Sequence, residues 1–163
     1  MKRIVLVMLV LAGFCVNANA QFFVSGTLGF NYRNDVFSMK VLPGVGYELN
    51  DRWAVAAEGG FSLYDGDFTG LLNPYVRFNF WTNDKLFLDA KAKSEIRFGD
   101  GFVNTFVGLA PSIRYAVNDH WQLSADMGAL GVDISKYKHL DASIDPAIGL
   151  FINGVDLTVI YKF

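Results

Sequence analysis

The sequence predicts an all-β protein, an eight-stranded antiparallel transmembrane β-barrel with up-and-down topology. Three observations carry this prediction. Apolar residues recur at every second position along most of the chain, a repeated phrase divides the chain into hairpins, and the last residues form an alternating apolar row. A period of two residues is that of a β-strand. After the first 20 residues, no stretch approaches the roughly 18 consecutive apolar residues of a membrane-spanning helix.

The N-terminus has the three parts of a secretory signal peptide. Lys2 and Arg3 provide positive charge, an apolar block runs over residues 4–16, and Ala18 and Ala20 supply small residues for a signal peptidase. The apolar block is shorter than the roughly 20 residues that a helical membrane span needs. We therefore expect a cleaved signal peptide that ends at Ala20.

The chain accordingly divides into a signal peptide, residues 1–20, and one outer-membrane β-barrel domain, residues 21–163. Cys15 leaves a lipoprotein open as an alternative, although Phe14 stands where a small residue is needed. The barrel domain keeps all 16 acidic residues and loses two of the 14 basic ones. Its net charge is therefore negative and it shows no basic stripe, so we expect no nucleic-acid partner.

Alternation is clearest along residues 86–98, where one face is wholly apolar and the other is densely charged. The same period recurs in seven other segments, and each is long enough to be a strand. The predicted strands cover residues 22–32, 40–49, 52–63, 72–80, 86–98, 107–117, 121–128 and 155–163.

A phrase that begins with proline occurs three times, as Pro43–Trp53, Pro74–Leu86 and Pro111–Trp121. Each copy contains a strand, an Asn-Asp pair and the start of the next strand, and Asn-Asp pairs favour tight turns. The other strand ends are joined by longer polar stretches. Short turns on one side and longer loops on the other are typical of an outer-membrane barrel, with the short turns in the periplasm. The longer stretches lie near Arg33–Ser38, Asp65–Gly70, Gly99–Asn104 and Asp133–Asp145.

The two faces of the predicted strands indicate which face is inside. The apolar faces carry Trp, Tyr, Phe and Leu, whereas the other faces combine small residues with long charged ones. Bulky aromatics from every strand would overfill an eight-stranded barrel, and a Lys or Arg that faces lipid at mid-depth costs about 2–4 kcal/mol. We therefore expect the charged residues to face the lumen and to pair there as a salt-bridge network, because an unpaired buried charge is costly. They are Lys40, Arg77, Lys91, Lys93, Arg97, Arg114 and Lys162, with Glu48, Glu58, Asp89, Glu95, Asp126 and Asp156.

Two local features constrain the barrel further. A proline removes one hydrogen bond from a strand ladder, and we expect Pro43 near the outer boundary, about 20 Å above the turn at Asp51. The alternation also shifts by one residue across Asn153-Gly154, which leaves either a bulge or a hairpin turn there. We assign Pro146–Ile152 to an extracellular extension, which keeps the number of strands at eight.

The end of the chain supplies the most specific motif. Val159, Tyr161 and Phe163 resemble the C-terminal signature by which outer-membrane barrels are recognised for insertion. Pro43–Trp53 and Pro111–Trp121 resemble the hairpins of the OmpX/OmpA-like family of small outer-membrane barrels. The resemblance implies insertion by a barrel assembly machinery, contact with outer-membrane lipid and lipopolysaccharide, and location in the outer membrane of a Gram-negative-type bacterium.

From these features we expect a monomer with a structural or surface-interaction role of the adhesion type, whose surface ligand the sequence does not identify. A narrow channel for ions or small solutes is an alternative, but eight strands leave little space for a pore. Its lining would be Lys91, Lys93, Glu95 and Arg97.

A lipid A-modifying enzyme is the remaining alternative. Acyl transfer needs a nucleophile or a base near the outer rim, and the local candidates are His139, Asp141 and Ser143. Polar loop residues of this kind are most often solvated, so we expect no catalysis.

No cofactor or metal ion is expected either. His120 and His139 lie at opposite ends of the predicted barrel and cannot share a metal. The acidic residues near the outer loops, Asp65, Asp67 and Asp100, lack the regular ligand spacing of a calcium-binding loop. We interpret the aromatic residues at strand ends as interfacial girdles. They are Tyr32, Trp53, Trp81, Trp121 and Tyr161.

Overall fold

The computed structural model describes residues 21–33, 36–64, 67–99, 102–137, 143–145 and 151–163. These residues form nine strands of one antiparallel sheet. The strands are β1 (Gln21–Arg33), β2 (Val36–Glu48), β3 (Trp53–Tyr64), β4 (Asp67–Asn83), β5 (Leu86–Gly99), β6 (Phe102–Ala116), β7 (Trp121–Tyr137), β8 (Ser143–Asp145) and β9 (Phe151–Lys162).

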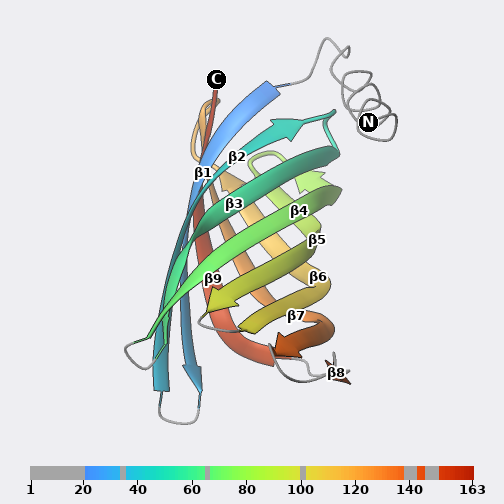
Figure 1. Ribbon diagram of the computed structural model, residues 1–163. Coiled ribbons are helices and arrows are strands. Elements are labelled where there is room, and N and C mark those ends of the chain that lie inside the picture. The colour runs from blue at the N-terminus through green and yellow to red at the C-terminus, as the bar shows by residue number, and fades with distance from the viewer. Residues whose placement is uncertain (1–20, 34–35, 65–66, 100–101, 138–142, 146–150) are drawn as a thin grey trace, which may run out of the picture.

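The sheet closes on itself, and this confirms the predicted eight-stranded barrel. Each strand from β1 to β7 pairs with the next one in the chain, and β9 lies between β7 and β1. The short strand β8 pairs only with β7, and Figure 1 shows it at the end of that strand, outside the closed ring. The topology is therefore up-and-down. Within the described residues, no helix is long and apolar enough to cross a membrane.

One end of the barrel, called the turn end below, carries the turns after β2, β4 and β6. Figure 1 shows the start of β1 and the end of β9 at this same end. Asn50 Oδ1 accepts hydrogen bonds from the backbone N–H groups of Arg52 and Trp53, both at 2.9 Å, and Asn118 makes the equivalent pair of bonds in its own turn. Asp84 adopts a positive φ of 50°, a conformation that Asp and Asn tolerate better than most residues.

The opposite end, called the far end, differs from the expectation of long loops. The ladders continue to Arg33 opposite Val36, to Tyr64 opposite Asp67 and to Gly99 opposite Phe102. Only two residues therefore separate the paired strands in three hairpins, and the loops predicted at these places are wrong. The polar residues of these segments that the structure describes, such as Ser38, Thr69 and Asn104, resemble loop composition but lie in paired strands. The connection from β7 to β9 falls mostly on residues 138–142 and 146–150, outside the described residues.

The three repeated prolines lie within their strands rather than at a rim. Pro43 is opposite Gly26 of β1, and β2 continues beyond it to Val36, so Pro43 lies inside the strand and not at its end. On the other side, the ladder with β3 has no pairs between Val41 and Gly44. Proline has no N–H group to donate, so it can pair with one neighbouring strand and interrupt the ladder with the other. Pro74 and Pro111 likewise pair with the preceding strand, and the ladder is interrupted on their other side.

The sheet contains three register shifts among the described residues. They lie at Asn79/Trp81 in β4, at Gly128 in β7, and between Phe151 and Val155 in β9. Because β9 runs without a break from Phe151 to Lys162, the phase shift at Asn153-Gly154 lies within a strand and is not a hairpin turn. The last two residues of the predicted extension Pro146–Ile152 therefore belong to β9, while residues 146–150 are outside the described residues.

The outer surface is apolar, and the lumen contains both polar and apolar side chains. Large exposed hydrophobic residues occur on all eight barrel strands. The buried polar and charged side chains alternate with them and face the lumen. Some buried inward residues are apolar, and the alternation in the sequence did not place Leu42, Leu71 and Ile160 on the inward face. The buried apolar residues are Phe23, Leu42, Ala54, Leu71, Tyr75, Ala110 and Ile160.

Candidate functional site

The lumen contains most of the charged side chains that the structure describes. All the charged residues of the predicted polar face lie there, arranged in three groups along the barrel. We name them the turn-end cluster (Glu48, Arg77, Asp89, Arg114, Lys162), the middle cluster (Glu58, Lys91, Asp126) and the far cluster (Lys40, Lys93, Glu95, Arg97, Asp156).

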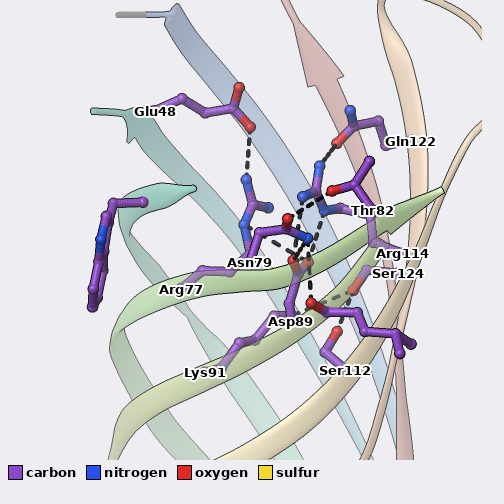
Figure 2. Close-up of polar contacts among 12 residues, drawn as sticks. Glu48, Arg77, Asn79, Thr82, Asp89, Lys91, Ser112, Arg114, Gln122 and Ser124 are labelled. Atoms are coloured by element: carbon purple, nitrogen blue, oxygen red, sulfur yellow. Dashed lines mark hydrogen bonds and ion pairs between the residues drawn. The ribbon is translucent and has the colours of Figure 1, made fainter. Parts of the chain in front are cut away.

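The turn-end cluster has a fully buried centre, where Asp89 has no exposed surface. Glu48 accepts from Arg77 at 2.6 Å and from Lys162 at 2.7 Å, one on each carboxylate oxygen. Asp89, with no exposed surface, accepts from Arg114 Nε at 2.8 Å and has Arg77 Nε at 4.0 Å. Figure 2 shows Arg77 and Arg114 pointing toward Asp89 from either side.

Neutral side chains provide further hydrogen bonds to this cluster. Asn79 donates to Asp89 at 2.8 Å, and Gln122 accepts from Arg114 Nη1 at 2.8 Å (Figure 2). The guanidinium groups also lie against aromatic rings, at 4.2 Å for Arg114 over Phe87 and 5.6 Å for Arg77 over Phe23. Both distances fall within the range of a cation–π contact. The turn end of the lumen is thus filled by side chains that contact one another.

The middle cluster contains one ion pair and one carboxylate without a cationic partner. Lys91 donates to Asp126 at 2.6 Å and to Ser124 at 3.5 Å. Glu58 instead accepts from three neutral groups. They are Thr27 at 2.8 Å, Asn73 at 2.9 Å and Ser25 at 3.3 Å.

The far cluster is a connected chain of charges. Lys40 bridges Glu95 at 3.1 Å and Asp156 at 2.9 Å. Asp156 also has Lys93 at 3.4 Å, and Glu95 also has Arg97 at 2.6 Å. The Arg97 side chain is 51% exposed, so the cluster meets solvent at this end.

Many of these ion pairs join strands that are not neighbours in the sheet. Lys40 on β2 reaches β5 and β9, Lys162 on β9 reaches β2, and Arg77 on β4 reaches β2. Inside the lumen, such contacts reach past one or two intervening strands. Buried charges that are paired and hydrogen-bonded avoid the large cost of an isolated charge, and most of the charged groups inside the barrel are paired in this way.

Glycine residues make room for the large inward rings. A side chain added at Gly46 would contact the ring of Phe23, and at both Gly108 and Gly131 it would contact the ring of Phe106. This matching was not visible in the sequence because it depends on which residues of different strands lie opposite each other. The available signal was the frequent glycine on the polar faces.

Aromatic pairs lie at both ends of the outer surface. At the turn end, Trp53 packs on Phe78 with ring centroids 4.6 Å apart, and Trp121 packs on Tyr161 at 4.9 Å. At the far end the pairs consist of phenylalanine, Phe30 with Phe37 and Phe61 with Phe68. The sequence interpretation had named Trp53, Trp121 and Tyr161 but not these phenylalanines, and the side chain of Tyr32 is outside the described residues.

The residues of the expected insertion signal lie where β9 meets β1 at the turn end. Val159 and Phe163 face outward and are exposed, and Tyr161 packs against Trp121 and Phe163. The N–H of Phe163 donates to the carbonyl of Phe22 at 3.3 Å, and Gln21 donates to the carbonyl of Phe163. The C-terminal residue is therefore tied to the first strand.

The structure describes few of the residues considered for catalysis and metal binding. His139, Asp141, Asp65 and Asp100 lie outside the described residues, and the side chains of Ser143 and Asp67 do too. His120 is exposed in its turn, with Nδ1 at 3.0 Å from the carbonyl oxygen of Lys162. Among the described residues, no group of three or more His, Cys, Asp or Glu side chains could hold a metal ion.

Comparison with known proteins identifies the fold. No protein-family model and no curated protein matches the sequence. A solved structure titled "Solution NMR structure of de novo designed TMB2.3" is similar, with a TM-score of 0.56 and 12% identity, over 91% of this chain and 98% of that chain. One titled "De novo design of transmembrane beta-barrels" aligns with a TM-score of 0.52 and 14% identity, over 90% of this chain and 98% of that chain.

The crystal structure of the outer membrane protein OprG from Pseudomonas aeruginosa also aligns, at 13% identity over 90% of this chain and 96% of that chain. Its TM-score of 0.43 is too low to establish a shared fold by itself. The two designed barrels, at low identity, show the fold and not a function. The chain thus has the fold of a transmembrane β-barrel, with eight antiparallel strands, an apolar exterior and a charged lumen.

Proposed function

We propose that this chain is an integral β-barrel protein of the bacterial outer membrane, with a structural or surface-interaction role and a lumen closed by its own side chains. The observation that carries the proposal is the inverted polarity of the barrel. Hydrophobic side chains cover the outside while buried charges pair across the lumen. A closed barrel satisfies its backbone internally, so it can stand in lipid with such a surface.

The proposal extends to the route by which the protein reaches this membrane. It is a small barrel of the OmpX/OmpA-like type, exported with a cleaved signal peptide and inserted as a monomer by the barrel assembly machinery. There it contacts outer-membrane lipid and lipopolysaccharide. The outward row that ends in Tyr161 and Phe163 supports recognition of β9 during insertion.

A closed lumen also argues against the alternative roles. Ion pairs such as Lys40 to Asp156 and Lys91 to Asp126 occupy the space through which a solute would pass. We therefore propose no conducting role and, with no catalytic cluster among the described side chains, no enzymatic role.

Cell fractionation with heat-modifiable gel mobility tests the location. We expect the protein in the outer-membrane fraction, running faster unheated than boiled because the closed barrel resists detergent. A chain recovered from the soluble periplasm would overturn the proposal. The outer-membrane marker and the periplasmic marker of the same preparation serve as controls.

Planar-bilayer recording tests the closed lumen. We expect no steady ion current from the wild-type barrel and none from the control Val76→Ala, whose side chain faces outward. A variant that carries both Lys91→Ala and Asp126→Ala removes one link across the lumen and should leak. Steady current of the same size from the wild type and this variant would show a channel instead.

A gene-deletion strain separates the structural role from the surface role. Complementation with a variant whose residues 138–142 are replaced by a Gly-Ser linker should restore detergent resistance of the envelope if the barrel itself supports the membrane. If the role depends on surface interaction, the linker variant should restore resistance but not attachment of the cells to one another or to a surface. Failure of the wild type to restore either property would reject both roles.

A further inference from the structure

Glu58 differs from the other carboxylates of the lumen. Among the described residues, each of the other five has a Lys or Arg nitrogen within 4.0 Å, and Glu58 has none. The Glu58 side chain is buried, at 3% exposed. Hydroxyl and amide donors satisfy its lone pairs but leave its negative charge without a counter-charge, which is costly in a buried position.

Two buried oxygen atoms at the level of the middle cluster have no hydrogen-bond partner among the described residues. They are Asn73 Oδ1 and Tyr75 Oη, on side chains that are each 5% exposed. Asn73 is the residue opposite Glu58 in the ladder between β3 and β4, and its Nδ2 donates to Glu58 Oε2 at 2.9 Å. Its Oδ1 therefore belongs to the same amide group that contacts the carboxylate. Tyr75 is the next inward residue along β4.

Buried polar atoms in folded proteins nearly always have a partner, and an exception points to a bound water or ion. Here Asn73 Oδ1 and Tyr75 Oη belong to inward residues of β4, the strand that pairs with β3 at the unneutralised carboxylate, whereas Arg77 Nη1 lies in the turn-end cluster. Lys91 does not supply the missing positive charge, because its ammonium is bound to Asp126 at 2.6 Å and lies over the ring of Tyr75 at 5.3 Å. With Glu58 and Asp126 against Lys91, the middle cluster keeps one net negative charge.

We propose that Glu58, Asn73 and Tyr75 form a buried binding site for one monovalent alkali cation, Na⁺ or K⁺. The available atoms are all oxygens, the ligands that hard cations prefer. A single carboxylate matches a single positive charge, and no described group of acidic or histidine side chains is large enough for a multivalent metal. The bound cation neutralises the middle cluster and ties β3 to β4 inside the lumen. The site depends on the folded barrel alone and goes beyond the proposed outer-membrane role.

Thermal unfolding of the purified full-length barrel in detergent tests this site. We compare equal concentrations of NaCl, KCl and N-methylglucamine chloride, since the last cation is too large to be buried. The expected Tm is higher in NaCl or KCl by roughly 3–5 °C when the cation is present at about ten times its dissociation constant. Equal Tm values in all three salts would overturn the proposal.

Matched variants assign any such effect to the site. Glu58→Gln keeps hydrogen-bond acceptors but loses the charge and should abolish the difference between the salts. Val45→Ala changes a side chain on the outer surface and should preserve the difference. If Glu58→Gln shows the same salt dependence as the wild type, the cation binds elsewhere and the proposal is wrong.

Tyr75 provides a second test that does not require removal of the carboxylate. Tyr75→Phe should reduce the shift between NaCl and N-methylglucamine chloride at least twofold, whereas Tyr47→Phe, which lies at the turn end outside the lumen, should not. Crystals grown with thallium(I), a heavy substitute for K⁺, should show anomalous density between Glu58, Asn73 and Tyr75. An unaltered shift in Tyr75→Phe, or the absence of that density, would overturn the site.

Discussion

Asp89 shows how much one residue of the lumen can hold in place. It has no exposed surface, and its two oxygens accept from Arg114 and Asn79 while Arg77 lies at 4.0 Å. Asp89 is therefore the ion-pair partner of Arg114 and also lies near Arg77. The closer carboxylate to Arg77 is that of Glu48, at 2.6 Å. Breaking a buried charge pair by removing one partner leaves the other uncompensated, which costs more than the pair itself contributes.

We expect Asp89→Ala to lower the free energy of unfolding by about 3–5 kcal/mol, because the buried Arg114 guanidinium loses the carboxylate that accepts its hydrogen bonds and Arg77 loses a nearby negative charge. The control is Arg97→Ala at the solvent-exposed far end, where a pair that water screens contributes less than about 1 kcal/mol. Urea unfolding of the barrel in lipid vesicles, followed by tryptophan fluorescence, measures both. Similar losses in the two variants would contradict the role assigned to Asp89.

Phe23 and Gly46 depend on each other for space in the lumen. A side chain at Gly46 would collide with the Phe23 ring, which is itself buried, so Gly46→Val should prevent the barrel from folding stably. Phe23→Ala removes the obstacle but leaves a cavity, at a cost of about 3–5 kcal/mol. The variant with both changes should be more stable than the sum of the two single losses predicts, by at least about 1 kcal/mol.

The outward position Gly26 is the matched control for that experiment, because a side chain there meets no atom within 4 Å. Gly26→Val should fold normally, as measured by heat-modifiable gel mobility. Strictly additive losses for Phe23→Ala and Gly46→Val would show that the two residues do not compete for the same space.

At the scale of the strands, the sequence predicted what is local and missed what depends on pairing. Alternation over residues 86–98 and the turns at Asn50 and Asn118 depend on neighbouring residues, and they agree with β5 and with the observed turns. The polar composition near Arg33 and Gly99 predicts loops, but both residues lie in strands because pairing with the opposite strand outweighs local composition.

The contents of the lumen were also predictable only in part. Alternation indicated which charged residues share a face, but not which of them meet. The contact from Lys40 to Asp156 joins residues more than a hundred positions apart, and it depends on the stagger of the strands around the closed barrel. For the same reason the sequence did not single out Glu58, whose distinction is the lack of a cation nearby.

Gly128 belongs to this group of pairing-dependent features. It has a φ of 69° and lies at the register shift where β7 gains one residue relative to β6. A left-handed backbone is strained for residues with a Cβ by about 1–2 kcal/mol, so Gly128→Ala should lower the free energy of unfolding by about that amount. Gly26→Ala should be neutral or slightly stabilising. Urea titration of both variants measures the difference, and an equal response would mean that the bulge relaxes without strain.

At the scale of the whole molecule, the barrel is built to the thickness of a lipid bilayer. On β3, Trp53 at the turn end and Phe61 toward the far end face outward and are eight residues apart. At about 3.3 Å per residue and a strand tilt of about 40°, they are separated by about 20 Å along the barrel axis. This is close to the apolar band of about 25 Å in known membrane barrels. The aromatic pairs thus mark the two edges of the lipid-facing surface.

The cost of a charge on the outer surface should therefore depend on its depth. Leu157 lies midway along β9 and Val117 follows the end of β6, and both side chains face outward and are exposed. We expect Leu157→Arg to lower the free energy of unfolding in lipid vesicles by about 2–4 kcal/mol, and Val117→Arg by about 0–1 kcal/mol, because an arginine near the interface reaches water. Urea titration scored by heat-modifiable gel mobility compares the two. If Val117→Arg costs as much as Leu157→Arg, the lipid boundary does not lie at the aromatic pairs of the turn end, and the barrel sits at a different depth.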